Sequence, residues 1–214
     1  MPTPDQPIRL HQHPLSGHCH RVALFLNLLG LPYQTVEVDL LRGDQKSAAF
    51  LALNPFAQVP VIEDGNTVLA DSNAILVYLA TRYDSGNWLP KAPEPAARVQ
   101  RWLSTAAGQL VNGPAIARIS NVFGREAALD QCIAIANQLF AVMDNELAER
   151  EWLAIERPTL ADVAMYSYTA HAPEGDISLE PYPHVRAWLA RIEALPGFIP
   201  MQRTPVGLQA AASV

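Results

Sequence analysis

The stretch Gln58-Val59-Pro60-Val61-Ile62-Glu63-Asp64-Gly65-Asn66-Thr67-Val68-Leu69-Ala70 decides the fold of the first half of the chain. Residues 59–62 and 67–70 predict two strands, and the turn between them is of the Asp-Gly type that closes hairpins. A proline that opens a strand removes a donor from the sheet, which favours either an edge position or a cis bond. In the cis alternative, the backbone of Val59 is exposed and can pair with an extended peptide as an added strand.

The residues before this stretch predict alternating strands and helices. The elements expected there are a strand, a helix, a strand and a short helix, over residues 8–13, 18–29, 33–40 and 44–53. After the hairpin, residues 73–83 repeat apolar side chains at helical spacing. The first half therefore reads β-α-β-α-β-β-α, with a right-handed parallel crossover between the first two strands.

A Pro- and Gly-rich stretch, residues 84–95, marks a domain boundary. All elements beyond it are predicted helices, over residues 96–118, 125–149, 159–170 and 184–194. The first is expected to bend at Asn112-Gly113-Pro114, and the tail from Thr204 is expected to be loose. The sequence thus predicts an α/β domain over residues 6–84 and an all-α domain over residues 94–208.

Composition excludes several classes of protein. Half of the 214 residues are hydrophobic and 17% are charged, which is typical of a packed core. The net charge is −6 and the basic residues are scattered, so no nucleic-acid partner is expected. No apolar run approaches the roughly 20 residues that span a membrane. A polar, Pro-rich start shows no signal peptide, and we expect a cytoplasmic protein.

A metal site is not expected. Four histidines surround Cys19, at positions 11, 13, 18 and 20, but alternate residues of a strand point to opposite faces and no acidic ligand lies nearby. The second cysteine, Cys132, lies in the apolar stripe of a helix and is interpreted as an inert core residue.

Two helix starts carry candidate binding groups. Ser72 is a possible N-cap of the helix after the hairpin, whose free N–H groups and dipole suit a carboxylate, while Asp71 can hold an ammonium group. Together they form a receptor for an α-amino acid head group, although ordinary capping explains them as well. At the first helix, Ser16 is a cap or a reactive hydroxyl, and Cys19 is a nucleophile or a buried packing residue. Asp162, after Thr159, is interpreted as a structural capping box.

Taken together, these motifs resemble the cytosolic glutathione transferases over nearly the whole chain, from about Ile8 to Phe198. The resemblance is carried by five segments in family order, residues 16–19, 54–60, 70–75, 158–164 and 190–197. It implies a thioredoxin-like N-terminal domain that binds glutathione and an all-helical C-terminal domain that forms the pocket for a hydrophobic substrate. It also implies a homodimer, in which the hairpin and the helix after Ser72 contact the 96–118 helix of the partner.

The resemblance assigns roles to individual residues. Pro60 matches the cis-proline of the family, and the Val59 backbone pairs with the cysteinyl unit of glutathione. Asp71 and Ser72 hold the γ-glutamyl group, and Lys46 and Gln58 lie near the glycine carboxylate. Ser16 matches the catalytic serine, whose hydroxyl donates a hydrogen bond to the thiolate, as in bacterial members of the serine type. Cys19 stands where some bacterial members carry a cysteine that forms a mixed disulfide with glutathione.

Three functions are compatible with these residues. In the first, the glutathione thiolate attacks an apolar electrophile, with wall residues drawn from the 96–118 helix (Trp102, Leu103, Ala106, Leu110 and Ile116). In the second, Cys19 serves a glutathione-dependent thiol–disulfide oxidoreductase or peroxidase. In the third, the same fold is a non-catalytic binding module. For the first of these functions, glutathione is the expected co-substrate, and no metal is expected.

Overall fold

The computed structural model describes residues 3–210 and divides the chain into two compact units. The first extends to Leu89 and includes Leu195–Gln202, and the second comprises Pro90–Ala194 and the chain from Arg203. The expected helical domain of residues 94–208 is thus interrupted by one segment that belongs with the first unit. Gly197 explains this, because it has a φ of +86° and a Cβ there would lie 2.7 Å from the carbonyl oxygen of Asn27.

The first unit contains a four-stranded sheet with the order β2-β1-β3-β4. Its strands are β1 (Ile8–Gln12), β2 (Tyr33–Glu37), β3 (Val61–Asp64) and β4 (Thr67–Ala70). Its helices are α1 (Gly17–Leu28), the short η1 (Asp44–Lys46), α2 (Ala48–Leu53) and α3 (Ser72–Tyr83). β1 and β2 are parallel, whereas β3 is antiparallel to both β1 and β4. The predicted β-α-β-α-β-β-α order and the parallel crossover are confirmed.

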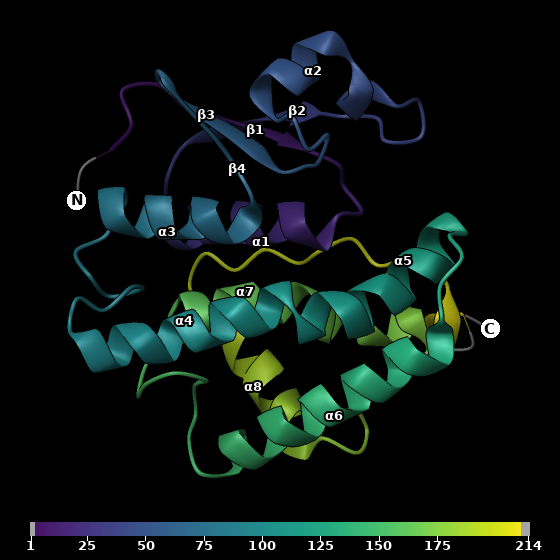
Figure 1. The fold of residues 1–214 in the computed structure, drawn as a ribbon. Helices are drawn as coiled ribbons and strands as arrows, with labels where there is room; N and C mark the ends of the chain where they lie inside the picture. The colour runs from purple at the N-terminus through teal and green to yellow at the C-terminus, as the bar shows by residue number, and fades with distance from the viewer. Residues whose placement is uncertain (1–2, 211–214) are drawn as a thin grey trace. The chain divides into compact units, whose positions relative to one another are not determined.

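Helices cover both faces of this sheet. Figure 1 shows α1 and α3 side by side on one face and α2 on the other. α1 is apolar on most sides, and its side chains from Val22 to Leu26 are buried together with Ile8 and Leu10 of β1. On the α2 face, Phe50 packs with Val38 and Val61. Burial on both faces fixes the strand register, because a slip of one residue would exchange the faces of every side chain.

The second unit is helical, as predicted. Its helices are α4 (Pro93–Ala107), α5 (Ile116–Phe123), α6 (Leu129–Ala148), α7 (Leu160–Ala170) and α8 (Pro183–Glu193), with short turns η2 (Val111–Ala115), η3 (Ala172–Gly175) and η4 (Gly207–Gln209). The single bent helix expected over residues 96–118 is instead divided. α4 ends at Ala107 with Gly108 as its C-cap, and Pro114 lies inside the π-helical turn η2. A proline cannot donate to the preceding turn, so the hydrogen-bond ladder widens there.

The start of α7 is a buried capping box, which confirms the structural interpretation of Asp162. One carboxylate oxygen accepts from the backbone N–H of Leu153 at 3.0 Å and from the indole of Trp188 at 2.9 Å. The other accepts from the backbone N–H of Thr159 at 2.8 Å and from its hydroxyl at 3.2 Å. This one side chain therefore connects a loop, α7 and α8.

The prediction of a loose tail from Thr204 onward is wrong for Thr204 itself. Its N–H and hydroxyl donate to Glu174 at 3.1 and 2.7 Å. Glu174 is buried and also accepts from Arg118 and His171 at 2.7 and 2.6 Å. Burial raises the pKa of Glu174, but the hydrogen bonds from His171 and Thr204 and the charge of Arg118 outweigh it and lower this pKa to about 2. No local pattern around Thr204 indicates an acceptor 30 residues away.

We predict that Asp162→Asn destabilises the protein by about 2–4 kcal/mol, because an amide has one acceptor oxygen and its nitrogen would face two donors of Thr159. Denaturant unfolding measures the free energy. The exposed Asp130→Asn, in the first turn of α6, is the matched control and should change it by about 0.5 kcal/mol or less. Equal effects of the two substitutions would contradict the connecting role of Asp162.

Candidate functional site

Strand pairing brings three loops to one end of the sheet. Val61 pairs with His11 of β1 and with Ala70 of β4. The residues just before Val61 therefore lie next to the end of β1 and to the residues that follow Ala70. Since β1 and α1 are joined by the turn that contains Ser16, the register alone places the turn, Val59-Pro60 and Asp71-Ser72 together.

The loop before β3 presents an unpaired backbone. The Val59–Pro60 bond is cis, which confirms the cis alternative. Asn54 is 3% exposed and holds the loop, because its amide donates to the carbonyl of Gln58 at 2.8 Å and accepts from the N–H of Phe56 at 3.1 Å. Within residues 3–210, no group pairs with the N–H or C=O of Val59. These two groups are available for an extended ligand.

At the start of α3 the cap is Asp71, not Ser72 as expected. The Asp71 carboxylate accepts from the N–H of Ala74 at 2.9 Å, and Ser72 is the first helical residue. Asp71 has a φ of +70°, a conformation that a side chain with a Cβ rarely adopts and that costs about 1–3 kcal/mol. The strained backbone leaves the exposed carboxylate beside the first turn of α3. An acid and a helix N-terminus are thus adjacent, as an α-amino acid head group requires.

Ser16 and Cys19 differ in their access to solvent. Ser16 caps α1, is partly exposed, and accepts from the N–H of Cys19 at 3.3 Å. Cys19 is 1% exposed. Burial raises the pKa of its thiol to about 11, and hydrogen bonds with the Ser16 side chain and the His13 backbone lower it only partly. Cys19 is therefore a protonated packing residue at neutral pH, whereas Ser16 remains partly exposed at the start of α1.

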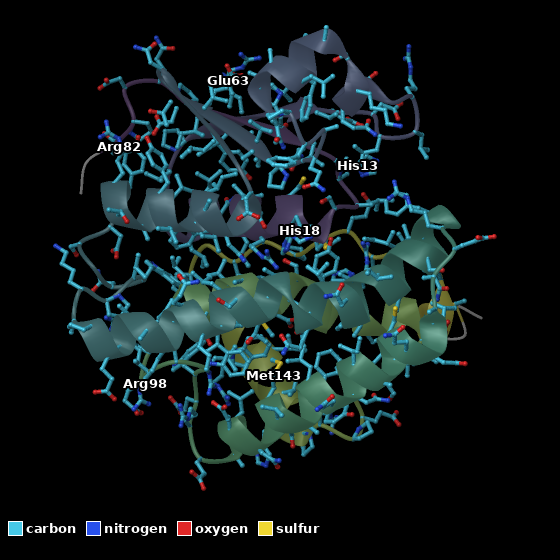
Figure 2. All side chains as sticks on the ribbon, in the orientation of Figure 1. His13, His18, Glu63, Arg82, Arg98 and Met143 are labelled. Carbon is cyan, nitrogen blue, oxygen red and sulfur yellow. The ribbon has the colours of Figure 1, made fainter. Side chains whose placement is uncertain are left out.

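Behind Ser72 lies a polar network that reaches α1. Arg21 donates from Nη1 to the Ser72 hydroxyl at 2.8 Å and to the side-chain oxygen of Asn73 at 3.0 Å. Nδ1 of His18 lies 3.3 Å from both Arg21 Nη1 and Ser72 Oγ. Burial, reinforced by the charge of Arg21, lowers the pKa of His18 to about 3, so this ring is neutral. Figure 2 labels His18 at the beginning of α1.

Two further predicted residues lie around the same end of the sheet. Lys46 closes the turn η1 and is exposed. It follows β2, whose last residue Glu37 pairs with the last residue of β1, Gln12. Gln58 is exposed directly before Val59. Both side chains are exposed at this end of the sheet, and their contact with a ligand carboxylate stays a prediction.

The histidines near Cys19 have separate partners. His11 donates to Glu63 at 2.6 Å, and His20 donates to the carbonyl of Ile199 at 2.9 Å. The His13 ring accepts from the N–H of Leu15 at 3.2 Å and shapes the turn before α1. No group of three or more potential metal-ligating side chains is found among residues 3–210. In the same range, no helix is both long and apolar enough to cross a bilayer.

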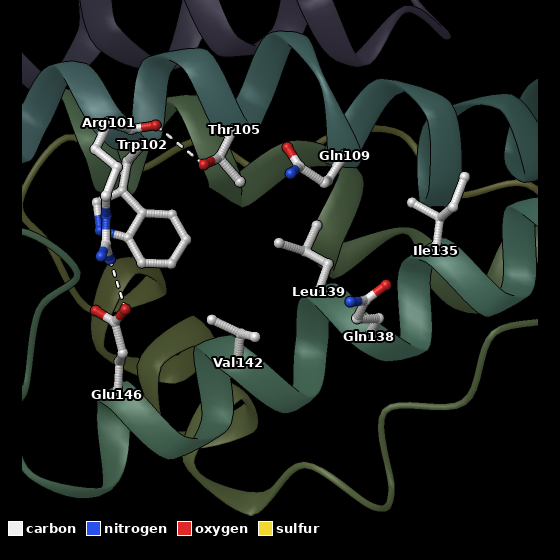
Figure 3. A pocket seen from close by; sticks show the side chains of 9 residues that line it. All are labelled: Arg101, Trp102, Thr105, Gln109, Ile135, Gln138, Leu139, Val142 and Glu146. Carbon is white, nitrogen blue, oxygen red and sulfur yellow. Dashed lines mark hydrogen bonds and ion pairs between the residues drawn. The ribbon is translucent and has the colours of Figure 1, made fainter.

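The helical unit contains a groove between α4 and α6, shown in Figure 3. Its volume is about 280 Å³, and Trp102, Leu139 and Val142 form its apolar wall. Arg101 bridges the groove to Glu146 at 2.6 Å and stacks over the Trp102 ring at 4.8 Å. Four of the five expected wall residues are core side chains, 0–4% exposed: Trp102, Leu103, Ala106 and Leu110.

Sequence reasoning missed two residues of the site, Arg21 and Asn54. The only signal for Arg21 is a charged residue inside a helix that is otherwise apolar on most sides, one turn after His18. Asn54 carries a weaker signal, because an Asn-Pro pair ordinarily just ends a helix. Its three hydrogen bonds within the loop are visible only in the structure.

Comparison with known proteins agrees with this geometry. Residues 15–82 match the N-terminal domain of glutathione S-transferases, and residues 90–196 match the C-terminal domain. Glutathione S-transferase 3 of Zea mays is 34% identical over 207 residues, which cover 90% of this chain and 91% of that protein.

Solved structures extend the likeness to three dimensions. A glutathione S-transferase from Pseudomonas fluorescens superposes with a TM-score of 0.87 at 33% identity and covers 92% of this chain and 100% of its own. A homologue from Drosophila mojavensis, solved with bound glutathione, gives a TM-score of 0.81 at 26% identity over 89% of both chains. With both domains matched in order and a relative that is 34% identical over 90% of this sequence, the chain belongs to the glutathione S-transferase family.

Proposed function

We propose that this protein is a glutathione transferase of the serine type, in which Ser16 stabilises the glutathione thiolate for attack on an apolar electrophile. The observation that carries the proposal is that three groups able to contact a ligand lie at one end of the sheet. These are the unpaired backbone of Val59, the start of α3 with Asp71, and the partly exposed residue Ser16.

Each feature suits one part of glutathione. The cysteinyl unit is an extended peptide and pairs with Val59 as an added strand. The γ-glutamyl head group carries a carboxylate, which suits the first turn of α3, and an ammonium, which suits Asp71. The glycine carboxylate is then left for Lys46 and Gln58. The bound glutathione of the Drosophila mojavensis homologue supports the same ligand for this chain.

Ser16 is the group assigned to the thiol. Its oxygen accepts from the Cys19 N–H at 3.3 Å. Its hydrogen, which lies against the protonated Cys19 thiol, can turn to the stronger acceptor that a bound thiolate provides. Cys19 remains protonated and supplies no competing anion. A charge-assisted hydrogen bond contributes about 1.5–3 kcal/mol, which lowers a thiol pKa by roughly one to two units.

The reaction then needs no further protein nucleophile. The glutathione thiol releases its proton to solvent, and the thiolate forms a C–S bond while the electrophile loses its leaving group, for example chloride. Rate acceleration comes from the larger thiolate fraction and from holding both reactants together. We assign the second substrate to the helical domain, where the remaining expected wall residue, Ile116, is partly exposed. Burial of Cys19 disfavours the oxidoreductase alternative.

We predict that Ser16→Ala lowers kcat/KM with a chlorinated aromatic acceptor by about 10- to 100-fold at neutral pH, because the thiolate loses a hydrogen bond. Cys19→Ala is the control and should retain activity within about threefold. Steady-state conjugation assays measure both. The opposite pattern, with Ser16→Ala silent and disulfide reduction lost in the Cys19 variant, would transfer the role to Cys19.

We predict that Asp71→Asn weakens glutathione binding by about tenfold, because the amide keeps the cap to Ala74 but loses the charge that attracts the ammonium group. Isothermal titration calorimetry gives the Kd. Thermal unfolding serves as a control and should shift by no more than about 4 °C, since the capping oxygen remains. Unchanged affinity would remove Asp71 from the head-group site.

We also propose a homodimer that uses the surfaces expected from the sequence, the hairpin with α3 of one chain and the α4 region of the other. The half-exposed Val142 in the groove beside α4 supports an apolar contact there.

Sedimentation equilibrium should therefore give twice the 23.4 kDa mass of one chain. Val142→Glu places a charge in the groove and should shift the mass toward the monomer, with Val68→Glu on the half-exposed face of β4 as a second probe. A single-chain mass for the unaltered protein at micromolar concentration rules the dimer out.

A further inference from the structure

Helix α1 carries one arginine, Arg21, in the middle of its buried face. The residue is 1% exposed, and its Nη1 group reaches the start of α3. There it contacts the hydroxyl of Ser72 at 2.8 Å, the side-chain oxygen of Asn73 at 3.0 Å and, back on α1, Nδ1 of His18 at 3.3 Å. A charged side chain is thus directed at the first turn of the helix assigned to the γ-glutamyl head group.

The geometry fixes the direction of these hydrogen bonds. Arg21 only donates, so Ser72 must accept through its oxygen and keeps its own hydrogen as a donor. Nδ1 of His18, 3.3 Å from the Ser72 oxygen, can accept that hydrogen. Hydrogen bonds from a hydroxyl are normally 2.5–3.0 Å long, so this bond is weak. The Ser72 hydrogen can therefore turn to a stronger acceptor with little loss.

A carboxylate is such an acceptor. A hydrogen bond to an ionised group is roughly twice as strong as one between neutral groups. Ser72, Asn73 and His18 are all neutral partners of Nη1, since burial and the Arg21 charge lower the pKa of His18 to about 3. A ligand carboxylate at Ser72 would thus gain both the hydroxyl hydrogen and the attraction of the guanidinium directly behind it.

We propose that Arg21 is a positioning residue, which holds the Ser72 hydroxyl as a donor to the α-carboxylate of the γ-glutamyl unit. The inference rests on the proposed function, because it needs glutathione at this site. Arg21 acts through Ser72 and Asn73. Its contribution is to fix the oxygen of Ser72 before the ligand arrives, so that no rotamer freedom is lost on binding.

The test compares two ligands on three proteins. Glutathione and γ-aminobutyryl-cysteinyl-glycine, which lacks only the α-carboxylate, are titrated into the unaltered protein, Arg21→Met and Arg82→Met. Arg82 lies in the last turn of α3, at the far end from Ser72, and is labelled in Figure 2. Arg21→Met should weaken glutathione binding about tenfold and leave the Kd of the analogue within about twofold. Arg82→Met should change neither.

Two additional variants separate positioning from folding. Arg21→Lys keeps a charge and a donor, and it should bind glutathione more tightly than Arg21→Met while discriminating against the analogue. If Arg21 acts through Ser72, the effects of Arg21→Met and Ser72→Ala on the glutathione Kd are not additive. Equal losses for glutathione and analogue, or full additivity, would overturn the role of Arg21. Failure of the unaltered protein to bind glutathione would instead overturn the proposed function.

Discussion

The pairing of β3 with β1 on one side and β4 on the other is the constraint on which the site depends. It places three loops that are distant in sequence at one end of the sheet. Direct contacts among the side chains of these loops are not needed for that placement. Burial of both sheet faces holds the register, since Ile62 and Leu10 face each other as fully buried partners. A slip of β3 by one residue would move Pro60 away from Asp71 and send each core side chain of β3 to the opposite face of the sheet.

Against this fixed backbone, burial decides which of two chemically plausible residues can act. Ser16 and Cys19 are three residues apart on the first turn of α1, and the dipole at this end of the helix favours an anion near either. The buried position of Cys19 outweighs that effect and raises its thiol pKa to about 11. Ser16 needs no ionisation to donate a hydrogen bond. The same turn therefore supports stabilisation of a ligand thiolate and not the formation of one by the protein.

Much of this could be predicted from the sequence, because it depends on local patterns. Apolar periodicity located the strands and helices, the Asp64-Gly65 turn fixed the hairpin, and the Thr159–Asp162 spacing identified the capping box. The exceptions depend on partners far along the chain. Ser72 looked like a cap, but its hydroxyl is held by Arg21, 51 residues earlier. Asp71 takes the capping role instead, with a φ of +70°. The attachment of Thr204 to Glu174 could not be seen from the tail alone.

The most direct measurement of the central claim is a crystal structure of the protein with glutathione bound. The account predicts that the cysteinyl N–H and C=O pair with the Val59 backbone, and that the sulfur lies within hydrogen-bond distance of the Ser16 hydroxyl. The γ-glutamyl head group should lie at Asp71 and Ser72. Glutathione bound elsewhere, or a sulfur in contact with Cys19 and remote from Ser16, would contradict it.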